Sequence, residues 1–128
     1  DVVATGTKII KSSNNNDPRN YVFDGQGHVV DGSQCSNKYL FNFTVAPGSN
    51  VTVKNVIFND FAGQVIYFIN TNNEVSDSSH VYLYVHNCTF NNIEPNVYGV
   101  VTIYSGIAGN PTVTSIRNFY HGSIQDCE

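Results

Sequence analysis

The carboxylates, histidines and tyrosines are the residues of this chain whose side chains could do chemistry. Hydrolysis of a glycosidic bond needs two carboxyl groups that face the scissile bond. Asp60 and Asp77 lie near strand-like segments, but neither has a second aspartate close to it in the sequence. Asp24 and Asp31 each precede a glycine, so we expect both to be turn residues. Since no carboxylate cluster is evident and residues 120–122 (Tyr-His-Gly) have no basic cluster beside them, we expect a protein that is not an enzyme.

The three cysteines allow at most one internal disulfide and leave one thiol over. Cys35 and Cys127 lie in turn-like or terminal settings, so they could pair with each other or bond to another chain. Cys88 takes an apolar strand position, and we expect it to be a buried free thiol. No Cys-x-x-Cys or His-x-x-x-His spacing occurs, so the sequence predicts neither a zinc site nor any other metal or cofactor.

The elements that must position these residues are strands. The chain has no Met and only two Leu, and it is rich in Val, Ile, Tyr, Phe, Thr and Asn, which fit pleated strands and tight turns. Residues 41–45 and 81–86 alternate apolar and polar side chains, as a half-buried strand does. No long segment has helical periodicity, so the fold class is predicted to be all-β.

A short phrase recurs along the chain: an apolar residue, any residue, Asn, and another apolar residue six places after the Asn. Its Asn falls at Asn55, Asn87 and Asn118, and a weaker copy has Asp24 in that place. The near-constant interval, about 31 residues, is typical of solenoids. We therefore expect one domain over residues 1–128, a right-handed parallel β-helix with one coil per interval, stacked so that these four residues form a ladder. Val22, Val53, Val85 and Ile116 would form an aliphatic column inside. A β-sandwich remains the alternative.

Residues 21–61, with the phrases YVFDGQGHVVDGS, YLFNFTV and NVTVKNVIFNDF, resemble the repeats of adhesin-like β-helix surface proteins of methanogenic archaea. They are also similar to the polymorphic outer-membrane repeat proteins of bacteria. The resemblance continues in phase, more loosely, to Ile124. It implies the superfold shared with pectate lyases and the role of an extracellular structural or adhesin-like module. The alternative is a carbohydrate-binding or polysaccharide-cleaving β-helix protein.

One outer stripe of this β-helix could bind a ligand. The positions just before the ladder are Phe23, Lys54, His86 and Arg117, and a second row beside them holds Tyr21, Thr52, Tyr84 and Ser115. Basic side chains flanked by tyrosines suit an anionic glycan or an acidic partner strip. The candidate ligand-binding residues are therefore Lys54, His86, Arg117, Tyr82 and Tyr84. A solvated sheet face explains the same pattern.

Three N-x-[ST] sequons, at Asn42, Asn50 and Asn87, favour an extracellular or cell-surface location and a glycoprotein. Because Asn87 belongs to a ladder that we expect to point inward, glycans should attach to Asn42 or Asn50 first. The net charge of −4 argues against a nucleic-acid partner, and no apolar stretch is long enough to span a membrane.

A solenoid has two open ends, and this sequence shows no amphipathic capping helix at either one. The expected partners are therefore further chain or other copies of the protein stacked head to tail, together with host or cell-surface glycans. Head-to-tail stacking does not close on itself, so it would produce a filament.

Overall fold

The structure, a computed structural model, describes residues 1–14, 16–36, 39–71, 78–94, 99–104 and 117–128. In these residues the regular structure is strand, with no helix, as the composition predicts. The strands are β1 (Val2–Val3), β2 (Lys8–Lys11), β3 (Asn20–Asp24), β4 (Val29–Asp31), β5 (Tyr39–Val45), β6 (Asn50–Asn59), β7 (Gln64–Asn70), β8 (Ser78–Asn91), β9 (Val101–Tyr104) and β10 (Arg117–Gln125).

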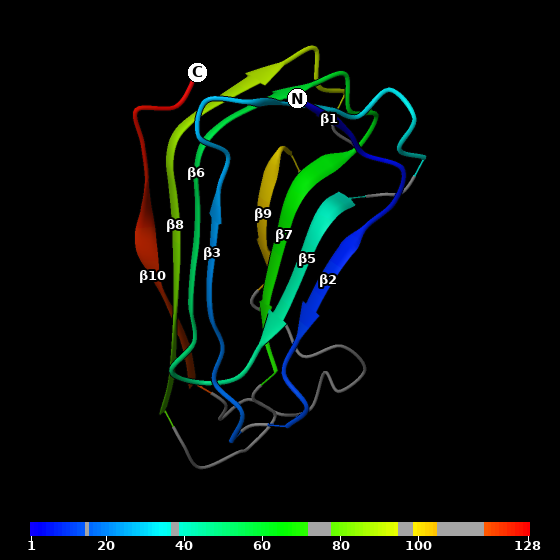
Figure 1. Cartoon of the computed structure of the whole chain (residues 1–128). Coiled ribbons are helices and arrows are strands. Elements are labelled where there is room, and N and C mark those ends of the chain that lie inside the picture. Colours follow the sequence, from blue (N-terminus) through cyan, green and yellow to red (C-terminus); the bar gives the residue numbers. More distant parts are fainter. Residues whose placement is uncertain (15, 37–38, 72–77, 95–98, 105–116) are drawn as a thin grey trace.

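The strands form two parallel sheets. The first sheet has the order β1-β4-β6-β8-β10, with β3 also paired to β6, and the second has the order β2-β5-β7-β9. From β4 to β10 the chain alternates between the two sheets, and from β5 onward each strand pairs with the previous strand of its own sheet. Figure 1 shows β10, β8, β6 and β3 side by side, facing the row β9, β7, β5 and β2. Every described strand pair is parallel, whereas β-sandwiches are built from antiparallel sheets.

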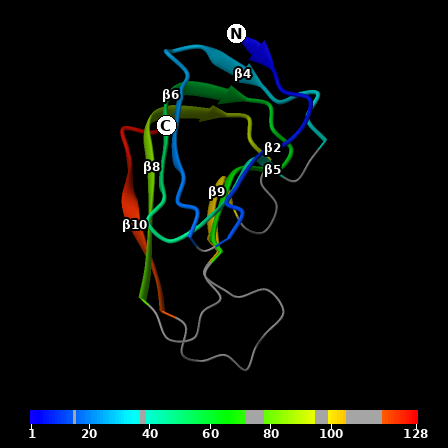
Figure 2. The same ribbon diagram turned by 60° about the horizontal axis from the view of Figure 1, so that its bottom comes forward.

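The long strands of the first sheet turn a corner where one residue has a left-handed backbone. Asn55 in β6 and Asn87 in β8 have φ of 54° and 52°, and Asp126, directly after β10, has φ of 52°. Asparagine and aspartate tolerate this conformation better than other residues with a side chain. After the corner, β6 and β8 continue beside β4, as the turned view in Figure 2 shows.

The repeat is confirmed between β6 and β8 but not in the last strand. Lys54 pairs with His86 and Val56 pairs with Cys88, which keeps Asn55 and Asn87 in one column. In β10, however, Asn118 pairs with Ser79 and Gln125 pairs with His86, so the register is several positions longer than the repeat predicts. The prediction that Asn118 is the fourth ladder residue is therefore wrong in this register, and Asp126 takes that position. Residues 105–116, including Ile116 of the predicted inner column, lie outside the described residues.

β3 differs from the predicted phase by one position. Phe23 pairs with Val53 instead of Lys54, so the faces of β3 are exchanged. Tyr21 and Phe23, expected outside, pack on the core, and Val22, expected inside, is 62% exposed. The chain then shifts further at the corner, through Gln26 and Gly27, and β4 pairs with the second half of β6.

Aromatic rings and valines fill the space between the sheets. Phe58 lies at the centre, with ring centroids 5.3 Å from Phe90, 6.1 Å from Phe61 and 6.2 Å from Phe41. Val53 and Val85, the two confirmed members of the predicted inner column, are completely buried. The described buried side-chain polar atoms all have hydrogen-bond partners. One example is Asn70, whose Nδ2 donates to Ser79 Oγ at 2.6 Å.

Candidate functional site

The corner of the first sheet carries a ladder of amide side chains. Asn87 Nδ2 donates to Asn55 Oδ1 at 3.0 Å, and Asn55 Nδ2 donates to Asp24 Oδ1 at 3.0 Å. The side chains of Asp24, Asn55 and Asn87 thus form the ladder that the repeat predicts, although the backbone of Asp24 pairs with Lys54 and not with Asn55. The ladder runs along the outside of the molecule: Asn87 is exposed, so the prediction that it points inward is wrong.

A second amide ladder, which was not predicted from the sequence, lies at the next corner. Asn91 Nδ2 donates to Asn59 Oδ1 at 3.0 Å, and Asn92 Nδ2 donates to Asp60 Oδ1 at 2.6 Å. Asp60 and Asn92 have left-handed backbones, with φ of 60° and 51°. The signal was present in the sequence as FNDF at 58–61 and FNNI at 90–93, which recur at the same interval as Asn55 and Asn87. Asp60 is therefore explained as a corner residue.

The first ladder forms one side of an open polar groove. This groove has a volume of about 430 Å³ and is lined by Gln26, Gly27, Asn55, Val56, Ile57, Asn87 and Thr89. Its lining combines amide and hydroxyl groups with short apolar side chains. Such a lining can exchange hydrogen bonds with hydroxyl groups, but it holds no carboxylate pair for acid–base catalysis.

The carboxylates of Asp24 and Asp31 form the expected turns. Asp24 Oδ1 accepts the backbone N–H of Gln26 at 3.0 Å, and Asp31 Oδ1 accepts that of Ser33 at 2.8 Å. The hydrogen bond from Asn55, followed by that from Gln26 and the charge of Lys54, lowers the pKa of Asp24. Hydrogen bonds from Ser33 lower the pKa of Asp31 in the same way. Both aspartates are therefore held ionised as structural acceptors.

The predicted basic stripe is only partly assembled. Lys54 and His86 are direct partners on β6 and β8, and Tyr82 and Tyr84 lie on the same outer face. Arg117 pairs with Ser78 through the backbone and is not in line with His86, which faces Gln125 instead. The two basic groups already have partners: Lys54 Nζ lies 3.5 Å from Asp24 Oδ2, and His86 Nε2 lies 2.7 Å from Ser123 Oγ. Because Asp24 offsets the charge of Lys54, this arrangement leaves little net positive charge for an anionic ligand.

Ring stacks run across both outer faces. His121 stacks on Tyr82 and on His80, each with centroids 5.0 Å apart, and His80 Nδ1 lies 2.8 Å from His121 Nε2. On the second sheet Tyr67 stacks on Tyr39 at 5.0 Å and on Tyr104 at 6.4 Å. Because the rings face one another, they support the neighbouring strands and present mainly edges to solvent.

The three sequons differ in what holds the asparagine. Asn42 is half-buried on the outer face of β5, where its Oδ1 accepts from Thr44 Oγ1 at 2.8 Å. Asn50 is exposed, and its Nδ2 donates to Asn20 Oδ1 at 3.2 Å. Asn87 Nδ2, the atom that would carry a glycan, is used in the ladder. Because Asn50 Nδ2 also donates hydrogen bonds, bonding does not separate Asn50 from Asn87, and the preference for Asn42 or Asn50 stays a prediction.

All three cysteines are free thiols in the structure. Cys88 is 1% exposed, as expected for a buried thiol. The proposed partners Cys35 and Cys127 are not bonded to each other. Cys35 follows β4, whereas Cys127 follows β10, and β6 and β8 separate these strands in the first sheet. Rows about 4.8 Å apart place the two cysteines well beyond the span of a disulfide.

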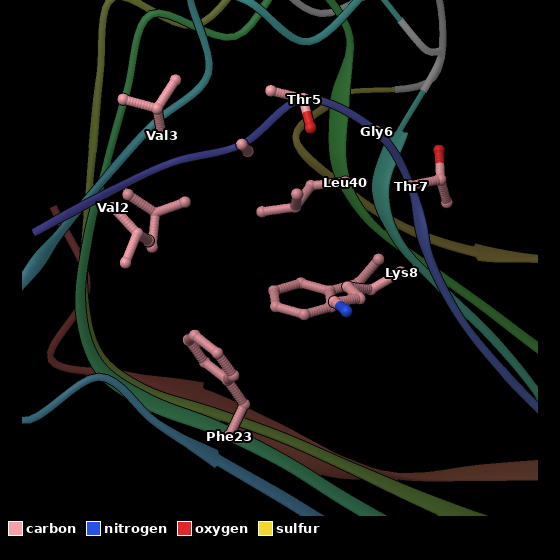
Figure 3. Close-up of a pocket in the computed structure, with 11 residues that line it drawn as sticks. Val2, Val3, Thr5, Gly6, Thr7, Lys8, Phe23 and Leu40 are labelled. Carbon is pink, nitrogen blue, oxygen red and sulfur yellow. The ribbon is translucent and has the colours of Figure 1, made fainter.

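The outermost strands leave apolar side chains uncovered at both ends of the strand stack. Val2 of β1, which pairs with the buried Val30, is 60% exposed at one end. Ile103 of β9 and Ile124 of β10, which pair with the buried Phe68 and Val85, are 46% and 56% exposed at the other. Under the segment from β1 to β2 lies a cavity of about 380 Å³, into which Phe23 and Leu40 point in Figure 3. Residues of both sheets line this cavity, including Val30 of β4 and Phe41 of β5.

In the described part of the chain, no three His, Cys, Asp or Glu side chains are grouped as metal ligands. The same residues contain no helix that could cross a membrane.

Comparisons of the chain with protein-family models, curated proteins and solved structures found no match.

Proposed function

We propose that this chain is a structural module of an extracellular, adhesin-like surface protein, built as a right-handed parallel β-helix. Three features support the architecture: the alternation of the chain between two parallel sheets, the left-handed corner residues, and the amide ladders that join successive rows. The right hand is the rule for connections between parallel strands. The resemblance of residues 21–61 to adhesin-like repeats points to the same class.

The observation that carries the function is the pair of uncovered ends. At each end the outer strands combine exposed apolar side chains with a sheet edge, a surface that natural proteins usually cover. In a structural module these edges receive further strands, either from adjoining chain or from a second copy. Because the two ends differ, copies would join head to tail and form a filament.

The outer faces suit a protein that stays hydrated without many charges. Only 12% of the residues are charged, and Asn, Thr and Tyr occupy outward positions of the strands. Glycans at Asn42 and Asn50 would add to this polar coat on the second and first sheets respectively. Such a coat fits a cell-surface location.

Electron microscopy of the secreted protein, with intact mass measured on the same sample, tests this function. We expect uniform fibres and mass in excess of the polypeptide, removed by a glycosidase that cleaves at asparagine. Monodisperse particles of 14.1 kDa without added mass would contradict both the filament and the glycan coat.

The polar groove beside the first ladder supports a second candidate, binding of a neutral glycan. Its amide and hydroxyl lining matches sugar hydroxyls better than Lys54, whose charge is paired with Asp24, matches an anion. Glycan-array binding by the wild type should fall at least about fivefold in Gln26→Ala, at roughly 1 kcal/mol per hydrogen bond. Gln34→Ala, an exposed glutamine outside the groove, is the matched control. Equal binding by both variants would exclude the groove.

A further inference from the structure

Cys88 and Cys127 occupy equivalent positions on neighbouring rows of the first sheet. The register of β8 with β10 continues past the end of β10. Glu128 N–H donates to Cys88 O at 3.0 Å, and Phe90 N–H donates to Glu128 O at 2.7 Å. In a parallel ladder these two bonds place Glu128 opposite Thr89, and therefore Cys127 opposite Cys88.

The two thiols point in the same direction. Cys88 Sγ lies 3.6 Å from Val53 O, and Cys127 Sγ lies 3.5 Å from Val85 O, so each reaches the same kind of carbonyl one row back. Opposite residues of neighbouring strands lie about 4.8 Å apart, within the Cα separation of about 4.4–6.8 Å that disulfides span. Cys127 is close enough to contribute to the raised pKa of Cys88, although burial is the larger cause.

We propose that Cys88 and Cys127 are a redox modification site, and that oxidation joins them in a disulfide that fastens the last described row to β8. The bond would link the corner segment after β10 to the core, where Cys88 is buried. It would protect the end of the stack in an oxidising environment and release it under reducing conditions.

The difference in burial sets the order of the reaction with a small disulfide such as oxidised glutathione. Cys127, which is half-buried, attacks first as a thiolate and releases one glutathione thiolate, leaving a mixed disulfide. Cys88 then loses its proton to solvent, attacks Cys127 Sγ and expels the second glutathione thiolate. The two cysteines lose two electrons and two protons in total, and the glutathione disulfide takes up the two electrons.

The second step should be slow at neutral pH. Burial raises the pKa of Cys88 to about 11, so only a small fraction of it is thiolate. Below that pKa the thiolate fraction grows about tenfold for each pH unit. Ring closure should therefore be about tenfold faster at pH 8 than at pH 7.

The experiment treats the folded full chain with oxidised glutathione, blocks remaining thiols by alkylation and maps the peptides by mass spectrometry. We expect a Cys88–Cys127 peptide that has lost two hydrogens. Cys88→Val, which copies Val56 of the neighbouring row, should stop at one added glutathione on Cys127. Cys35→Ser should form the same disulfide as the wild type.

Hydrogen exchange gives a second readout that does not depend on a substitution. Oxidation of the wild type should slow amide exchange in β10 and leave β5 unchanged. The proposal is overturned if folded wild type keeps an alkylatable Cys88 while Cys127 carries glutathione at pH 8, or if the mapped disulfide contains Cys35.

Discussion

At the scale of single residues, the distance to the neighbouring backbone decides which glycines can be replaced by a residue with a side chain. Gly122 in β10 has φ of 136°, and a Cβ built on it would lie 1.6 Å from the carbonyl oxygen of Leu83. A side chain cannot fit unless β10 moves away from β8. Gly27, at the first corner, also has a positive φ of 83°, but no atom lies within 4 Å of its Cβ position. Substitution of Gly122 therefore combines a steric clash with backbone strain, whereas substitution of Gly27 causes backbone strain alone.

Gly122→Ala should lower the free energy of unfolding by at least about 3 kcal/mol, because it adds a clash to the cost of a left-handed backbone. Gly27→Ala should cost only about 1 kcal/mol, the conformational part alone. Urea denaturation of both variants measures the difference. Equal losses would mean that β10 does not pack on β8 in this register.

Asp24 should make stability depend on acid. Its pKa is lowered in the folded state, first by the hydrogen bond from Asn55, so its contribution is complete above the unfolded pKa of about 3.9 and is lost as the pH falls through the folded value. Thermal melting of wild type and Asp24→Asn from pH 6 to pH 2.5 tests this. The wild type should have the higher melting temperature at pH 6, and the difference between the two melting temperatures should disappear in acid. A difference in melting temperature that does not change with pH would contradict the stabilising role of the Asp24 carboxylate.

At the scale of elements, the aromatic interior holds the two sheets together. Phe58 of β6 is completely buried and contacts rings from both sheets, including Phe41 of β5. Phe58→Ala should destabilise the protein by about 3–5 kcal/mol, because it leaves a cavity between the sheets. Val22→Ala, on the exposed face of β3, should change stability by less than about 0.5 kcal/mol. Chemical denaturation checks both, and a small effect at Phe58 would place the core elsewhere.

The strands themselves could be predicted from the sequence, but the register of some of them could not. Alternation and β-branched composition predicted the strands, and the pair Asn55 and Asn87 predicted the ladder, since both rest on local residue chemistry. The phase of β3 could not be predicted because one position of shift exchanges its faces, and only contacts of Phe23 with the second sheet fix the choice. The prediction for the last row, β10, was wrong for a similar reason. Asn118 matches the phrase, but the pairing of β10 sets Asp126 opposite Asn87.

The candidate site was harder to predict than the strands. Lys54, His86, Tyr82 and Tyr84 do share an outer face, but their sequence spacing could not reveal that Asp24 and Ser123 already bond the two basic groups. The cysteine pair was missed because Cys127 lies opposite Cys88 only in the longer register that β10 adopts.

At the scale of the whole molecule, the proposed filament depends on the two uncovered ends. Val2 and Ile124 belong to outer strands at opposite ends of the stack and pair with the buried Val30 and Val85, so both face the space between the sheets, and both are exposed. Val22 is equally exposed, at 62%, but it points from the outer face of β3. A lysine at any of these positions changes the net charge of −4 by the same amount. Only a lysine at an end should oppose stacking, because it would bury a charge between apolar rows.

The most direct test is sedimentation velocity of the wild type, Val2→Lys, Ile124→Lys and Val22→Lys over a range of concentrations. Stacking through the ends predicts association of the wild type and of Val22→Lys that increases with concentration. Either end variant should lose association by at least about tenfold, which corresponds to roughly 1.4 kcal/mol. A wild type that stays monomeric at every concentration, or association that all three variants weaken equally, would contradict stacking through the ends.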